Sequence, residues 1–129
     1  MTDEQQDAAW ENAIIVDGYN KDLVRKDICG AWMEKDKYKD ADSSFGWHVD
    51  HIRPQAGNED YASIDGHDYM DDDLNLQAMQ IVNNGMGGKG NKYPTFDSAI
   101  QGSGKSNIES VEEFTISQEK QDELEELFK

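Results

Sequence analysis

Several residue types that stabilise or target small proteins are scarce in this sequence. The single cysteine, Cys29, excludes an internal disulfide and the paired Cys-x-x-Cys motifs that bind zinc in many small domains. No apolar run approaches the roughly 20 residues that a membrane-spanning helix needs. The N-terminal stretch MTDEQQDAAW lacks the basic start and the apolar core of a signal peptide. We therefore expect a cytoplasmic protein without membrane contact, stabilised by packing.

Basic side chains are also in short supply. The chain has 12 lysines and arginines against 28 aspartates and glutamates, which gives a formal net charge of −16. The acidic residues are spread along the sequence, so no segment is a basic arm or an isolated acidic tail. A length of 129 residues fits one compact domain, and 36 % apolar against 31 % charged residues is typical of a small globule with a polar surface.

Apolar periodicity predicts a helix at each end of the chain. Trp10, Ile14 and Ile15 have helical spacing and precede an Asp-Gly turn signal, which favours a short N-terminal helix. Near the C-terminus, Thr115 and Gln118 fit a capping box, and an apolar stripe in DELEELFK follows them. We therefore expect a last helix that packs against the core.

The middle of the chain alternates apolar segments with polar ones. Residues 21–38 are apolar enough to be buried, but Gly30 interrupts the helical pattern, so their type stays open. The segment FGWHVDHIRP, residues 45–54, predicts a strand that ends at its proline. Residues 55–73 predict a long surface loop, and residues 74–82, LNLQAMQIV, resume the apolar alternation. The segment SAIQGSGKSN, residues 98–107, predicts a linker or turn.

Some prominent side chains have a simple structural interpretation. Trp32 and Trp47 are predicted core residues, because a small domain needs large apolar side chains. Cys29 is predicted to be buried, since no neighbour would lower the pKa of its thiol. His67 and the acidic run 71–73 lie in the predicted loop and are expected to be solvated.

Asp50 and His51 are the side chains best suited to chemistry. Hydrolysis of a phosphodiester needs a base that activates water and a cation that balances the charge on the phosphoryl oxygens. An imidazole can be that base, and a carboxylate oxygen can bind the cation. Adjacent strand residues point to opposite faces, so both can reach one site only if the strand breaks there. Pro54 is placed to help cause that break.

The segments that carry these residues resemble the HNH endonucleases, whose fold is also called the ββα-metal or His-Me finger fold. The matching stretches are RKDICGAWM, GWHVDHIRP, DDLNLQAM and NNGMGGKGNKYP, which together span roughly residues 25–96. The resemblance implies an α+β protein: one domain over residues 1–129, with a ββα-metal core and flanking helices. Residues 97–129 are then a C-terminal extension that ends in a helix.

The resemblance also implies roles for individual residues. Asp50 falls on a metal ligand, and His51 falls on the general base that activates water. Asn75 falls on the residue that pins the loop and aims the His51 ring. Asn84 falls on the second protein ligand of the metal, with Asn83 as the alternative.

Further implied contacts concern phosphate and the identity of the metal. Lys89 and Arg53 would meet phosphate oxygens, and a shell with two protein ligands suits Mg²⁺. The spacer GMGG before Lys89 is longer than usual in this family, which leaves the choice between Asn83 and Asn84 open. His48 stands where the family has a residue that does not bind metal. As a third ligand it would favour Zn²⁺ or Ni²⁺, and Mn²⁺ is a further alternative to Mg²⁺.

The sequence thus predicts a metal-dependent endonuclease that hydrolyses a phosphodiester bond. We expect the substrate to be DNA. No sequence-reading module accompanies the core, so we expect weak sequence specificity. The acidic composition implies weak DNA binding unless cations such as Lys92, Arg25 and Lys26 converge on one face, or a partner protein supplies affinity. The alternative is a catalytically silent acidic module with the same fold that mimics nucleic acid or inhibits a basic partner.

Overall fold

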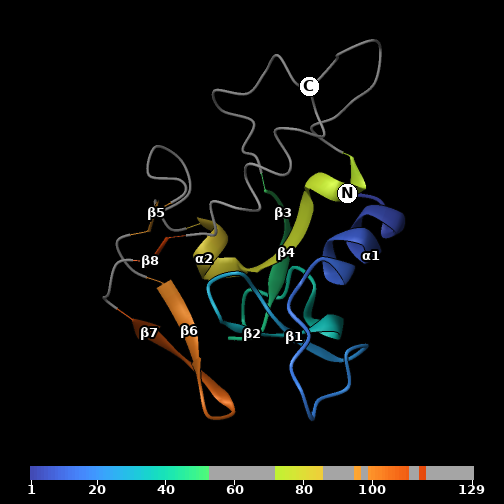
Figure 1. Ribbon diagram of the computed structural model, residues 1–129. Helices are drawn as coiled ribbons and strands as arrows, with labels where there is room; N and C mark the ends of the chain where they lie inside the picture. Colours follow the sequence, from blue (N-terminus) through green and yellow to red (C-terminus); the bar gives the residue numbers. More distant parts are fainter. Residues whose placement is uncertain (53–71, 86–94, 97–98, 111–113, 116–129) are drawn as a thin grey trace.

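A computed structural model describes residues 1–52, 72–85, 95–96, 99–110 and 114–115 (Figure 1). In this part of the chain, two helices and four two-stranded antiparallel sheets make up an α+β protein, as the sequence predicted. The helices are α1 (Asp3–Glu11) and α2 (Ile81–Gly85), with 3-10 turns at η1 (Lys35–Lys37) and η3 (Asp73–Asn75). The strands are β1 (Val24–Lys26), β2 (Trp32–Glu34), β3 (Trp47–His51), β4 (Leu76–Gln80), β5 (Thr95–Phe96), β6 (Ala99–Ser103), β7 (Ser106–Ser110) and β8 (Phe114–Thr115).

Helix α1 begins at a capping box. Thr2 accepts the N–H of Gln5, and the Gln5 side chain accepts the N–H of Thr2 in return, so two otherwise unpaired N–H groups of the first turn are satisfied. The predicted N-terminal helix is therefore present, but it ends at Glu11. Its predicted register was wrong, because Ile14 pairs with Lys26 in an isolated β-bridge and both Ile14 and Ile15 are exposed.

The segment whose type the sequence left open is a hairpin. Strands β1 and β2 pair antiparallel with Arg25 opposite Met33, and the chain reverses at Gly30, whose φ of 92° favours glycine. Arg25 and Met33 share the face that packs under α1, where both are fully buried.

The main core lies between α1 and the β3–β4 ladder. Trp10 of α1 packs on Trp47 of β3 with ring centroids 5.3 Å apart, and Leu76 and Ala78 of β4 complete the cluster with Met33. Trp47, Leu76 and Ala78 lie on the same face of the ladder, whereas Met79 lies on the other face. Trp32 and Trp47 are both buried, as predicted.

Of the linker or turn predicted over residues 98–107, only a turn at Gly104 and Lys105 is present, and strands lie on both sides of it. Strands β6 and β7 form a regular hairpin there, with a two-residue turn at Gly104 and Lys105. Ala99 packs against Cys29 and Met79 in a second apolar cluster, which confirms that Cys29 is buried. In Figure 1 this hairpin lies beside α2, on the opposite side of the ladder from α1.

Two predicted features fall largely or wholly outside the described residues. The long loop is predicted over residues 55–73, of which the structure describes only Asp72 and Asp73. The C-terminal helix is predicted after Thr115, and residues 116–129 are not described. Thr115 itself pairs with Thr95 where β8 meets β5.

Candidate active site

The two predicted catalytic residues, His51 and Asn75, and the predicted metal ligand Asp50 lie at one end of the β3–β4 ladder. His51 is the last residue of β3 and stands opposite Leu76, the first residue of β4. The N–H of Ile52 donates to the carbonyl of Asn75 over 2.8 Å, which extends the ladder by one bond. The antiparallel register therefore brings Asn75 next to the His51 end of β3, although the two residues are far apart in sequence.

Asp50 is a buried carboxylate held by its cross-strand neighbour. Its side chain is 3 % exposed, and Oδ2 accepts a hydrogen bond of 2.9 Å from Nε2 of Gln77, the residue directly opposite. Sequence analysis missed Gln77. The signal was available in principle, because the antiparallel pairing of two predicted strands places one residue of β4 across from Asp50.

The strand does not break between Asp50 and His51. Both residues belong to β3, so the register places Asp50 on the face of Gln77 and His51 on the opposite face with Leu76. The chain bends only after His51, at Ile52. Pro54, which was expected to help break the strand, lies outside the described residues.

Asn75 is fixed by the turn that precedes β4. Asp72 caps η3 by accepting the N–H of Leu74 on its side chain, and its carbonyl accepts the N–H of Asn75 over 2.8 Å. The Asn75 side chain is fully buried. An Asp at this position favours such a turn because its carboxylate can accept a backbone N–H two residues ahead.

A second buried carboxylate, Asp27, joins three parts of the chain, namely its own hairpin loop, β4 and α2, and was not anticipated. Its Oδ1 accepts the N–H groups of Cys29 and Ala31, and its Oδ2 accepts the N–H of Gln80 and Nδ2 of Asn83, all at 2.9–3.1 Å. Burial raises the pKa of Asp27, while these hydrogen bonds act in the opposite direction. The only sequence signal was the Asp-x-x-Gly turn, which does not reveal the contacts with Gln80 and Asn83.

The two candidate asparagines of α2 have different surroundings. Asn83 is buried, donates to Asp27 and to the carbonyl of Ile100, and accepts the N–H of Ile100 on its Oδ1 over 2.7 Å. Asn84 is half-buried. These bonds tie α2 to β6, on the side of the ladder that carries Met79 and Asp50.

His48 shares the Asp50 face of β3 and stands opposite Met79. It is half-buried, and burial together with the nearby Lys39 charge lowers its pKa. The neutral imidazole is therefore favoured, which is the form that binds metals.

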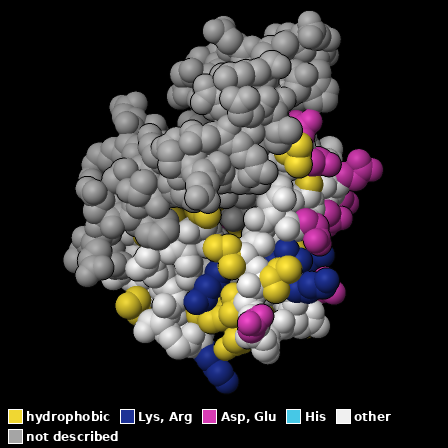
Figure 2. All heavy atoms as spheres, viewed as in Figure 1, with side chains coloured by type: hydrophobic (Ala, Val, Ile, Leu, Met, Phe, Trp, Pro, Cys, Tyr) yellow, Lys and Arg dark blue, Asp and Glu magenta, His cyan; other side chains and the backbone are white. Residues whose placement is uncertain are grey.

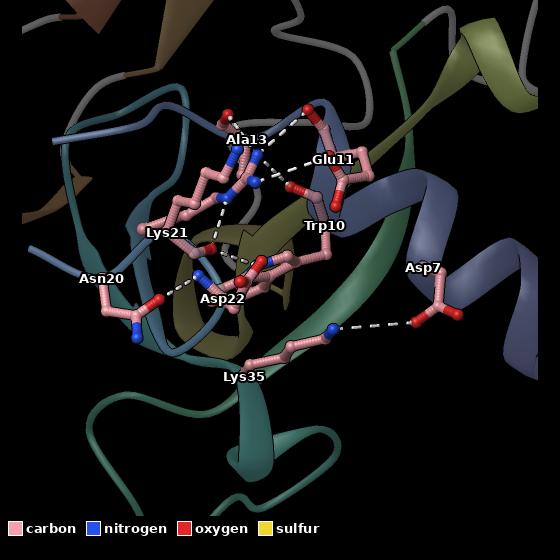
Figure 3. Close-up of polar contacts among 9 residues, drawn as sticks. Asp7, Trp10, Glu11, Ala13, Asn20, Lys21, Asp22 and Lys35 are labelled. Carbon is pink, nitrogen blue, oxygen red and sulfur yellow. Dashed lines mark hydrogen bonds and ion pairs between the residues drawn. The ribbon is translucent and has the colours of Figure 1, made fainter.

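Arg25 cannot serve as a phosphate contact. Its guanidinium is 1 % exposed and donates to the carbonyls of Trp10, Glu11 and Lys21 (Figure 3). Arg25 therefore drops out of the set of cations that could converge on one DNA-binding face, since burial removes it from the surface. The other predicted phosphate contacts, Arg53 and Lys89, lie outside the described residues.

The side chains that most often bind metals do not form a cluster within the described ranges. Within residues 1–52, 72–85 and the short strands that follow, no three His, Cys, Asp or Glu side chains come together. The predicted ligand set is of another kind, one carboxylate and one amide, with His48 as the additional candidate.

Neither described helix is long and apolar enough to cross a membrane.

The resemblance to HNH endonucleases stays a prediction. Comparison with protein-family models, with curated proteins and with solved structures gives no match to this chain.

Proposed function

We propose that this protein is a metal-dependent endonuclease of the HNH type that hydrolyses phosphodiester bonds, with DNA as the expected substrate. The observation that carries the proposal is the order β3–β4–α2, with Asp50 and His51 at the end of β3, Asn75 directly before β4 and Asn84 on α2. This order of two strands and a helix is the one that the HNH resemblance implies, and it supports the proposal.

The donor set fits a hard divalent cation. We assign the metal to a carboxylate oxygen of Asp50 and the amide oxygen of Asn84, and Mg²⁺ suits two oxygen ligands completed by water and substrate. Gln77 supports this role, because its bond to Oδ2 holds the Asp50 carboxylate in one orientation. Asn83 is the poorer ligand, since its oxygen already accepts a backbone N–H.

His51 is the proposed general base. A bound cation would stabilise the charge that develops on the phosphoryl and leaving oxygens. His51 takes the proton from the attacking water. Asn75 lies next to the end of β3, and we assign it the role of orienting the His51 ring. In β3, His51 and Asp50 point to opposite faces of the ladder. The proposal therefore requires the His51 ring, at the last residue of the strand, to reach the face that carries Asp50.

Plasmid nicking at low salt tests the proposal. Mg²⁺, Mn²⁺, Ni²⁺ and Zn²⁺ are supplied in turn to the parent protein, to His51→Ala and to the matched histidine variant His67→Ala. We expect metal-dependent nicking that falls at least about 100-fold in His51→Ala, the usual contribution of a general base, and that is unchanged in His67→Ala.

Nicking by His51→Ala at the parent rate would show that His51 is not the base. No cleavage with any metal, from protein that is folded by circular dichroism, would favour the silent acidic module. That alternative draws on the net charge of −16 and on the acidic side chains along the α1 side of the surface (Figure 2).

A further inference from the structure

A cavity of about 220 Å³ opens beside the β1–β2 hairpin and shares no residue with the candidate active site. Its walls include three aromatic side chains, Tyr19, Trp32 and Phe45, together with one acidic and one basic side chain, Glu34 and Lys105. The volume is below the roughly 300 Å³ at which pockets for drug-sized ligands begin, so the cavity suits one small planar group.

The register of the hairpin explains why two of the lining side chains, Trp32 and Glu34, lie on one face. Val24 stands opposite Glu34 and Lys26 opposite Trp32, so all four share the face that points away from the buried Arg25. The Lys26 ammonium lies 4.4 Å from the centre of the Trp32 ring, which is cation–π distance. This face therefore combines an aromatic platform with a cation.

Trp32 is held rigidly from behind. Its indole N–H donates to the carbonyl of Gly104, and its backbone N–H donates to the Asn107 side chain, both over 2.8 Å. These bonds fix the β6–β7 turn against the hairpin and bring Lys105 to the cavity. Tyr19 lies over Trp32 with ring centroids 4.8 Å apart and is 40 % exposed, so it is a supported ring that a ligand can reach.

The surface around this hairpin differs from the rest of the visible surface. Figure 2 shows lysines and arginines among hydrophobic side chains on the lower part of the described face, whereas acidic side chains run along the α1 side. In a chain with a net charge of −16, cations beside the exposed ring of Tyr19 favour an anionic ligand that has a flat ring.

We propose that this cavity binds one base of a single-stranded nucleic acid, stacked on Tyr19, with Lys26 and Lys105 contacting the flanking phosphates. Every base has a π-face that stacks on an aromatic ring, and bases in a duplex are already stacked on each other, so the single strand is the preferred ligand. Glu34 accepts N–H groups from the edge of the base. The choice of nucleic acid rests on the proposed function.

The test measures binding without cleavage. In the His51→Ala background with EDTA, fluorescence anisotropy follows a labelled ten-nucleotide single strand of mixed sequence and the matching duplex at low salt. We expect Tyr19→Ala to weaken single-strand binding at least tenfold, the loss of one stacked base. Its matched control is Leu23→Ala, which truncates a side chain that is 60 % exposed and does not line the cavity.

A second pair of variants tests the cations. We expect Lys105→Gln to weaken single-strand binding and to reduce its salt dependence, because one phosphate contact is lost. Lys37→Gln removes the same charge from η1, outside the cavity, and is expected to leave both unchanged.

Equal affinities for Tyr19→Ala and Leu23→Ala, or tighter binding of the duplex than of the single strand, would overturn the assignment of the cavity. These results are independent of catalysis. If the parent protein nicks plasmid but Tyr19→Ala binds the single strand normally, only the proposed role of the cavity is overturned. If binding depends on Tyr19 but no metal-dependent nicking is seen, only the proposed endonuclease function is contradicted.

Discussion

The two ends of the β3–β4 ladder hold different kinds of polar cluster. Near the Trp47 end, Asp27 accepts four hydrogen bonds from the protein, and Asn83 is bonded on both its amide atoms. At the other end, Asp50 and His51 stand beside Asn75, and one carboxylate oxygen of Asp50 is oriented by a side chain.

The hydrogen bonds of Asp27 show that this carboxylate stabilises the fold. A carboxylate has about four sites for accepting hydrogen bonds, and all four of Asp27 are filled by donors from the fold. Metal binding there would cost several of these bonds. We therefore assign Asp27 and Asn83 to the fold, whereas the proposal that Asp50 and Asn84 hold a metal rests on the HNH resemblance.

The largest expected effect comes from Asp27→Asn. The new amide places an N–H₂ group against N–H donors that are buried, and each unsatisfied donor costs about 1–3 kcal/mol. We expect the free energy of unfolding to fall by about 3 kcal/mol or more in urea denaturation. Asp36→Asn, on the exposed part of η1, is the control and should change it by less than about 0.5 kcal/mol. Equal stabilities of the two variants would show that Asp27 does not hold the fold.

The adjacent asparagines provide the next contrast. Asn83→Ala should lower the free energy of unfolding by about 2 kcal/mol, because it leaves Asp27 and both backbone groups of Ile100 short of a partner. Asn84→Ala should change stability little but should weaken divalent metal binding more than Asn83→Ala does. Calorimetric titration of metal into both variants measures this, and the reverse order would move the ligand to Asn83.

The smallest expected effect is a pH dependence at His48. Because its pKa is lowered in the folded state from the ordinary 6.5, the unfolded chain takes up the proton first as the pH falls. The stability linked to His48 is thus complete above about pH 6.5 and is lost as the pH falls through the folded pKa. His48→Gln should remove this part of the slope between neutral pH and pH 5 in urea denaturation. Parallel curves for the two proteins would mean that His48 is not desolvated in the fold.

Local patterns were enough to predict several elements. The alternation in GWHVDH gave β3, which ends at His51, and the alternation in LQAMQ gave β4. The β6–β7 hairpin was missed because its residues are polar or small. Gly102 looked like a linker residue, but a Cβ at that position would lie 2.8 Å from Nε1 of Trp32, so the glycine permits close packing. The Gly104–Lys105 pair was the available hairpin signal.

For the candidate site, the sequence could indicate only which residues lie near one another on paired strands. Motif residues that lie on neighbouring strands could be placed, since antiparallel pairing relates them directly. The Asp27 cluster was out of reach, because it joins Asp27, Gln80 and Asn83 through tertiary contacts that no local pattern records. Arg25 was counted among the cations that could converge on one face, and no local pattern indicated that its guanidinium donates to the carbonyl groups of Trp10 and Glu11.

Titration of Mn²⁺ into metal-free protein by calorimetry tests the central claim most directly. The comparison uses Asp50→Asn, His51→Ala and Asp17→Asn, the last of which removes an exposed carboxylate and so controls for unspecific binding to an acidic protein. The account predicts that Asp50→Asn weakens binding at least about tenfold, while His51→Ala and Asp17→Asn bind like the parent. Binding by Asp50→Asn as tight as that of Asp17→Asn would contradict it.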